Sequence, residues 1–133
     1  MLRIESPLSS VEEEVFTLAM DCAFAVHRAL GPGFRERIYD EAFCLELNAR
    51  GIKFEREKKI DVRYKNWLIP GQRIDLLVDG VVLVEIKAVS RILKVHERQV
   101  RSYLKTMDLH AGLLVNFNVA MLKNGLHRIV RRG

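Results

Sequence analysis

The chain of 133 residues has few of the features that mark disulfide-rich, repeat or membrane proteins. It holds only two cysteines, one tryptophan and three prolines, and it has no internal repeat or low-complexity tract. Nowhere does it approach about 18 uncharged apolar residues in a row, which a membrane-spanning helix needs. Its N-terminal stretch lacks the basic and apolar regions of a signal peptide. We therefore expect no membrane span, no disulfide scaffold, and a cytoplasmic location.

The composition that remains is that of an ordinary globular protein. Hydrophobic residues make up 49% of the chain and charged residues 29%, and the length suits one domain over residues 1–133. Cys22 and Cys44 fall on apolar helical faces, so we interpret them as small core residues in a reducing compartment. The net charge of +5 is compatible with a polyanionic partner, although many small proteins are equally basic.

Two helices are expected in the first third of the chain. Helical spacing of apolar residues predicts a helix from about Ser10 to Leu30, with a capping box formed by Ser10 and Glu13. Residues 31–33 end it, and a second helix follows from about Phe34 to Arg50. The predicted inward residues are Val11, Val15, Leu18, Cys22, Val26 and Ala29 in the first helix, and Phe34, Ile38, Ala42, Leu45 and Ala49 in the second.

The rest of the chain is typical of a sheet interrupted by one helix. Residues 52–70 predict one or two strands with a turn near Lys65-Asn66, where Trp67 is interpreted as hairpin packing. Residues 73–89 predict two apolar strands joined through Asp79-Gly80. A helix over about Leu93 to Asp108, a buried strand over 111–117 and an edge strand over 125–132 complete the order ααββββαββ. We expect an α/β fold with a mixed central β-sheet flanked by helices.

An acid and a base stand inside one of the apolar strands. Glu85 and Lys87 are two residues apart and so share a face of the strand. On their own they would suit a structural ion pair, although such a buried pair is costly to desolvate. Asp75, in the preceding strand, changes that interpretation. Two carboxylates beside a lysine suit metal-assisted phosphodiester cleavage, because hard oxygen ligands hold Mg²⁺ and the metal polarises the phosphate.

The turn between these strands decides whether the acids can meet. A two-residue turn at Asp79-Gly80 would place Asp75 on the opposite face from Glu85. A three-residue turn over 78–80, with its glycine left-handed, would pair Asp75 with Leu83. The two carboxylates would then share a face at a diagonal spacing of roughly 7–8 Å. The functional hypothesis therefore predicts a three-residue turn or an equivalent bulge.

These residues, in this order, resemble the PD-(D/E)xK nuclease superfamily. The segment "GFRERIY", from Gly33 to Tyr39, is similar to the signature of its GxxExxY family. Further segments resemble that family in the same order, over about residues 11–130: "VHRALGPG", "RIDLLV", "LVEIKAV", "HERQVRSYL" and "GLLVNFNV". One departure is that no proline directly precedes Asp75.

The resemblance implies a restriction-endonuclease-like core with a metal site at the hairpin. It implies that Asp75 and Glu85 bind Mg²⁺ or Mn²⁺ and that Lys87 is the catalytic lysine. Glu36 matches an acid that the first motif contributes from a helix. The carbonyl of Ile86 is a candidate third ligand.

The helix after Lys87 carries two polar stripes. The first resembles a motif of the exonuclease branch that lies beside the active site, and we expect it to position the substrate or the lysine. The resemblance rests on Gln99 and Tyr103, and His96 lies on the same side of the helix by its spacing. The second is a basic stripe that can follow a nucleic-acid backbone or form a solvated face. It consists of Lys94, Arg98, Arg101 and Lys105.

Three functions are open at this stage. The first is a metal-dependent nuclease that hydrolyses phosphodiester bonds of nucleic acid, with DNA as the expected substrate. The second is a catalytically inactive nuclease-fold module that binds nucleic acid or a protein partner. In the third, the charge cluster serves folding alone. A homodimer is compatible with the size, although no feature of the sequence shows one.

Overall fold

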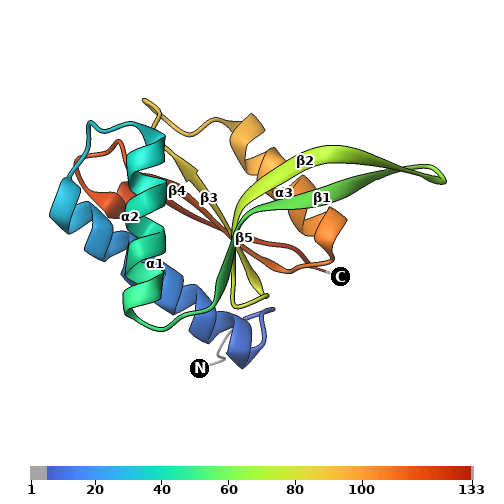
Figure 1. Ribbon diagram of the computed structural model, residues 1–133, viewed down its shortest axis with the longest axis horizontal. Coiled ribbons are helices and arrows are strands. Elements are labelled where there is room, and N and C mark those ends of the chain that lie inside the picture. The colour runs from blue at the N-terminus through green and yellow to red at the C-terminus, as the bar shows by residue number, and fades with distance from the viewer. Residues whose placement is uncertain (1–5, 133) are drawn as a thin grey trace, which may run out of the picture.

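The computed structural model describes residues 6–132, which form a mixed sheet with strand order β1-β2-β3-β4-β5 and helices on both faces (Figure 1). The strands are β1 (Phe54–Tyr64), β2 (Trp67–Val78), β3 (Val82–Lys87), β4 (Ala111–Asn116) and β5 (Leu126–Val130). The helices are α1 (Ser10–Leu30), α2 (Glu36–Ala49) and α3 (Lys94–Met107), with a short 3₁₀ helix, η1 (Leu122–Asn124), before β5. The expected α/β fold with a mixed sheet is confirmed.

The strand directions explain why α3 stands where it does. β1, β2 and β3 are successively antiparallel, and so are β4 and β5, whereas β3 and β4 are parallel. A parallel pair needs a long crossover, and α3 supplies it. The predicted edge position of β5 and the full burial of β4 are both confirmed.

One strand replaces two that were expected separately. β2 continues from Trp67 through Pro70 and Gly71 to Val78, so three strands precede α3 instead of four. The pairing with β1 shifts register at this point, and Gly71 has a φ of 112°. The extra residues are therefore absorbed as a bulge, where a proline needs no ladder partner.

The sheet separates two apolar cores. Residues of α1 and α2 pack on one face, against side chains such as Leu76, Val84 and Leu113. Residues of α3 pack on the other face, against Leu83 and Leu114.

Gly112 of β4 lets α3 approach the sheet closely. A Cβ added there would lie 2.8 Å from a Val100 methyl group. The absence of a side chain at this position helps to fix how close α3 lies to β3 and β4.

The start of α1 differs from the prediction by one residue. The capping box consists of Ser9 and Glu12: the Ser9 hydroxyl accepts from the Glu12 N–H at 3.1 Å, and the Ser9 N–H donates to the Glu12 carboxylate at 2.8 Å. Because Ser9 is the cap, Val11 lies in the exposed first turn. Ala29, near the other end, is also exposed. The predicted helix bounds are confirmed.

The buried face of α2 differs from the predicted one. Phe34 and Leu45 are exposed. The residues that are buried are Tyr39, Phe43, Cys44 and Leu47. Tyr39 fixes this orientation, because its ring stacks on Phe117 with centroids 4.7 Å apart and 4° between the planes.

Tyr39 also closes the connection between α1 and α2. Its hydroxyl donates to the Gly31 carbonyl at 2.6 Å and accepts from the Phe34 N–H at 3.2 Å. Gly33, which begins the "GFRERIY" segment, has a φ of 109°, a conformation that favours glycine. The segment thus sets the position from which α2 starts, and Glu36 is its first residue.

The β1–β2 hairpin extends beyond the helices as an arm (Figure 1). Its predicted turn at Lys65-Asn66 is confirmed. Trp67, which was interpreted as hairpin packing, pairs with Tyr64 across the hairpin and leaves 72% of its surface exposed.

The remaining general expectations concern the cysteines and membranes. Cys22 and Cys44 are free and buried, as expected, and burial raises the pKa of their thiols to about 11 and about 12. Within residues 6–132, none of the helices combines the length and the apolar character needed to cross a membrane.

Replacement of Tyr39 by phenylalanine tests the closure between α1 and α2. The ring remains, but the buried Gly31 carbonyl loses its donor, so we expect the free energy of unfolding to fall by about 1–2 kcal/mol. Urea denaturation followed by circular dichroism measures this. Tyr64→Phe is the matched control, since Tyr64 is exposed and its change is expected to be near zero. Equal stability of the two variants would contradict the anchoring role.

Candidate active site

The turn between β2 and β3 has the predicted length but a shifted position. It comprises residues 79–81, between the paired residues Val78 and Val82. Asp79 and Gly80 have φ values of 48° and 71°, and the Val81 N–H donates to the Val78 carbonyl at 3.1 Å. The left-handed glycine is as predicted, whereas the turn begins one residue later.

This shift changes the partner of Asp75 without changing its face. Leu83 pairs with Leu77 instead of Asp75, and continuing the register brings Asp75 level with Glu85. The difference is two residues, and side chains alternate with a period of two, so Asp75 and Glu85 still share a face. The predicted diagonal arrangement is thus replaced by a direct one.

The carboxylates of Asp75 and Glu85 accept hydrogen bonds where the backbone ladder between β2 and β3 ends. The last paired residues of β2 and β3 are Leu76 and Val84. One step further, the Asp75 N–H donates to Glu85 Oε1 at 3.0 Å, and the Ile86 N–H donates to Asp75 Oδ2 at 2.9 Å. Each carboxylate therefore takes the place of a backbone acceptor on the neighbouring strand, which fixes both side chains.

Glu85 is buried, with 4% of its surface exposed. Burial raises the pKa of its carboxyl to about 8, and the charge of Asp75 adds to this effect, while Lys87 acts against it. Asp75 and Lys87 are only partly buried. Asp75, Glu85 and Lys87 thus form a poorly hydrated cluster, referred to below as the pocket, which solvent reaches through Asp75 and Lys87.

Lys87 has a partner on α3. Its Nζ donates to Gln99 Oε1 at 3.4 Å, which brings together two residues predicted for the site. Gln99 is itself exposed, so this contact lies on the solvent side of the cluster. The arrangement leaves the ammonium beside the acids without an ion pair that would hold it to either of them.

Tyr103, also predicted, lies deeper and has a partner that the sequence did not indicate. Gln72 Nε2 donates to the Tyr103 hydroxyl at 2.8 Å. Burial raises the pKa of Tyr103, and the charge of Glu85 adds to that effect, which places the ring near the acids. Gln72 follows the bulge at Gly71. Its position could not be predicted, because the bulge decides which way the side chain points.

Glu36, the first residue of α2, is exposed to solvent. Partial burial of its carboxyl raises the pKa, the charge of Asp75 raises it further, and Lys87 lowers it. Glu36 is therefore close enough to feel both residues, although no hydrogen bond joins it to either. Its place at the first residue of α2 follows from the anchoring of Tyr39.

A main-chain carbonyl oxygen is the other candidate metal ligand beside the carboxylates of Asp75 and Glu85. Within residues 6–132, no three His, Cys, Asp or Glu side chains lie close enough together to hold a metal ion. The Lys87 carbonyl accepts from Phe117 on the β4 side, whereas the Ile86 N–H points to Asp75 on the β2 side. Since the N–H and C=O of one strand residue point the same way, the Ile86 carbonyl lies on the side of the acids.

His96 makes a structural contact at the start of α3, and its predicted place beside the substrate stays a prediction. Its Nδ1 accepts from the Leu93 N–H at 3.0 Å and so satisfies a free donor at the start of α3. Neither Glu85 nor Lys87 is among its hydrogen-bond partners in the described residues.

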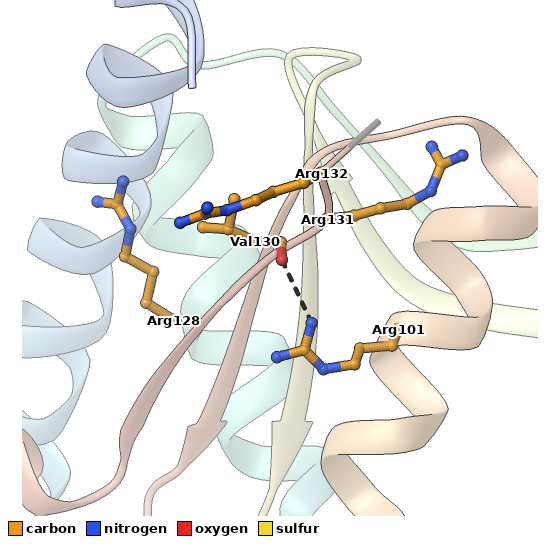
Figure 2. Close-up of a pocket in the computed structure, with 5 residues that line it drawn as sticks. All are labelled: Arg101, Arg128, Val130, Arg131 and Arg132. Carbon is orange, nitrogen blue, oxygen red and sulfur yellow. Dashed lines mark hydrogen bonds between the residues drawn. The ribbon is translucent and has the colours of Figure 1, made fainter. Parts of the chain in front are cut away.

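The predicted basic stripe of α3 borders two different depressions, and its role toward nucleic acid stays a prediction. Arg101 donates to the Val130 carbonyl at 3.2 Å and lines a depression with arginines at the end of β5 (Figure 2). Lys105 lines a different groove, against the β1–β2 arm. Lys94 and Arg98 are exposed. The split arises because the β5 edge and the arm lie on different sides of α3.

Comparison with known proteins agrees with this geometry. Residues 13–129 match the family model of the PD-(D/E)XK nuclease superfamily. The chain belongs to that superfamily. Comparison with curated proteins gives no match. The crystal structure of SSO0001 is similar, with a TM-score of 0.52 and 18% sequence identity; the match covers 92% of this chain and 63% of that one. At this identity the likeness shows the fold alone.

Replacing Glu85 by glutamine tests the charge in the pocket. The folded pKa of about 8 lies above the ordinary 4.5, so the contribution of Glu85 to stability is greatest below about pH 4.5 and is lost as the pH rises through 8. Glutamine keeps the acceptor for the Asp75 N–H and carries no charge. With a chelator present, we expect Glu85→Gln to be more stable than wild type at pH 8 by on the order of 1–3 kcal/mol.

The pH series supplies the control for this measurement. The gain from Glu85→Gln should vanish as the pH falls below 4.5, because the wild-type carboxyl then becomes protonated in the unfolded state as well as in the folded state. Glu14→Gln, at an exposed position of α1, should change stability little at either pH. Loss of stability in Glu85→Gln at pH 8 would indicate that the charge cluster serves folding.

Proposed function

We propose that the protein is a divalent-cation-dependent nuclease that hydrolyses phosphodiester bonds, with DNA as its substrate. One observation carries the proposal. The exchanged hydrogen bonds between Asp75 and β3 hold two carboxylates together, and Lys87 follows on the same face. Membership of a nuclease superfamily supports this interpretation of the pocket.

The donors suit a hard cation. Asp75 and Glu85 would hold Mg²⁺ or Mn²⁺ through carboxylate oxygens, with the carbonyl of Ile86 as a third donor. Such an ion would neutralise charge that develops on the phosphate and make a nearby water more acidic. The raised pKa of Glu85 fits this role, because two acids that repel each other in a dry pocket gain most from a neighbouring positive charge.

Lys87 is the group we expect to act on the reacting atoms. Its ammonium would orient the attacking water or bind a phosphate oxygen as negative charge grows there. Gln99 accepts from Nζ and so would hold the ammonium on the solvent side of the pocket. A positioned side chain of this kind contributes roughly 10²–10⁴-fold to a rate.

The other residues would position the reactants. Glu36 lies close enough to Asp75 and Lys87 to influence the water that lies between substrate and acids. Tyr103, held by Gln72, would form one wall of the pocket. These two roles are supported by proximity alone and are secondary to the acid–acid–lysine set.

Replacement of Lys87 by alanine tests the catalytic step. We expect the cleavage of a labelled DNA in Mg²⁺ or Mn²⁺ to slow by at least about 100-fold, whereas binding of the same DNA, measured by anisotropy in EDTA, should change little. The loss arises because the ammonium acts mainly in the transition state. Lys53→Ala is the control, since Lys53 is exposed, directly precedes β1 and is not part of the acid–acid–lysine set.

Two results would contradict the proposal. Equal cleavage by wild type and Lys87→Ala would place the activity elsewhere or in a contaminant. Tight DNA binding without cleavage by either protein, in both cations, would indicate a nuclease-fold module that has no turnover.

A further inference from the structure

The distal part of the β1–β2 arm exposes an unusual set of side chains. Trp67 and Tyr64 are 72% and 57% exposed. Three aliphatic residues beside them are also exposed: Val62, Leu68 and Ile69. A soluble protein rarely leaves so many large apolar groups together unless a partner covers them.

The strand register arranges most of these groups on one face. Tyr64 pairs with Trp67, and Val62 pairs with Ile69, so their side chains form two successive cross-strand pairs on the same side. The two aromatic rings stand nearest the turn. Lys65, in the turn, places its ammonium 5.4 Å from the centre of the Tyr64 ring.

The arm is also strongly basic. Residues 58–73 contain five basic residues and one acid, a net charge of +4, whereas the whole chain carries +5. Lys58 pairs with Glu55 at 2.9 Å. Four of the basic residues have no carboxylate within ion-pair distance in the part of the chain that the structure describes: Lys59, Arg63, Lys65 and Arg73.

A groove runs between the arm and α3. Its cations are Arg63 and Lys65 from the arm and Lys105 from α3, and its one acid is Asp61. Two hydroxyl-bearing residues of α3, Ser102 and Thr106, line the same groove. Arginine, lysine and hydroxyl side chains are the usual contacts to phosphate oxygens.

The groove leads toward the pocket of acids. β2 runs without a break from Trp67 to Asp75, a path of about 26 Å for eight residues of strand. Along it, Gln72 bonds to Tyr103, the neighbour of Ser102 in α3. A strand that follows the arm would therefore reach the carboxylates.

Charge decides between two kinds of partner. A second copy of the chain could cover the apolar face, but two arms of net charge +4 would repel each other when placed together. A nucleic acid has the complementary charge and offers flat bases to aromatic side chains. Bases must be unpaired to present those faces, which excludes a regular duplex.

We propose that the β1–β2 arm binds an unpaired nucleic-acid strand. Trp67 and Tyr64 stack on bases, and Arg63, Lys65 and Lys105 neutralise phosphates in the groove. The inference rests on the proposed function, which supplies DNA as the substrate class. It adds that the DNA bound by the arm is unpaired. Single-stranded DNA, or a duplex with an unpaired end, is then what the arm delivers to the acids.

Trp67 is the only tryptophan of the chain, so its fluorescence reports on the arm directly. Titration with a short single-stranded DNA in EDTA should quench the emission, and the same sequence as a blunt duplex should quench it much less. Trp67→Ala should weaken binding of the single strand, measured by anisotropy, by about fivefold or more, as expected for one lost stack. Leu45→Ala, which removes an equally exposed side chain from α2, should leave the affinity unchanged.

The groove is tested by a charge-matched pair of variants. Lys65→Gln should make the dependence of log affinity on log salt concentration shallower by about one unit. Lys53→Gln removes the same charge at the other end of β1 and should leave the slope as in wild type. Equal slopes for both variants would overturn the role of the groove.

The outcomes separate the arm from the catalytic proposal. Binding in EDTA is measured on wild type and on Lys87→Ala, so absence of cleavage does not affect it. Unchanged affinity in Trp67→Ala, or quenching by duplex as strong as by single strand, overturns the arm proposal while leaving the nuclease proposal intact. A Trp67 emission that shifts with protein concentration, without DNA, indicates a second copy on the arm and overturns it as well.

Discussion

The site depends on one exchange of hydrogen bonds between neighbouring strands. Where the ladder of β2 and β3 ends, Asp75 donates its N–H to the Glu85 carboxylate, and the Ile86 N–H donates to the Asp75 carboxylate. The strands can separate there because side-chain oxygens replace the missing backbone acceptors, as buried N–H groups require. The same bonds hold two acids against each other in a pocket with little water. That costs stability even with the Lys87 ammonium nearby, and a bound divalent cation would relieve the cost.

The rest of the fold brings further groups to this point. Tyr39 locks the connection between α1 and α2 and so sets where Glu36 begins its helix. Gly112 lets α3 pack closely on β4, and α3 carries Gln99 to Lys87 and Tyr103 toward the acids. The "GFRERIY" segment is thus mainly structural: its glycine and tyrosine shape a turn, and its glutamate is the one member that approaches the pocket.

Some of this could be predicted from the sequence because it depends on periodicity. Asp75 and Glu85 share a face whether the register is the predicted one or the observed one, since the two differ by an even number of residues. Helical spacing likewise placed Gln99 and Tyr103 together. Gln72 could not be found, because a bulge at Pro70-Gly71 sets its direction. The inward face of α2 was predicted wrongly, because aromatic stacking of Tyr39 on Phe117 outweighed the aliphatic pattern. The contact of His96 with the Leu93 N–H could not be predicted from periodicity, because it depends on a donor left free at the start of α3.

The account as a whole rests on the claim that the carboxylates of Asp75 and Glu85 form one cation site. Anomalous diffraction from crystals soaked in Mn²⁺ tests this most directly. The account predicts an anomalous peak between these two carboxylates, within bonding distance of both and next to the Ile86 carbonyl. A soaked crystal with no peak there, or with its peak at the Asp40 and Glu41 pair that already binds Arg56, would contradict it.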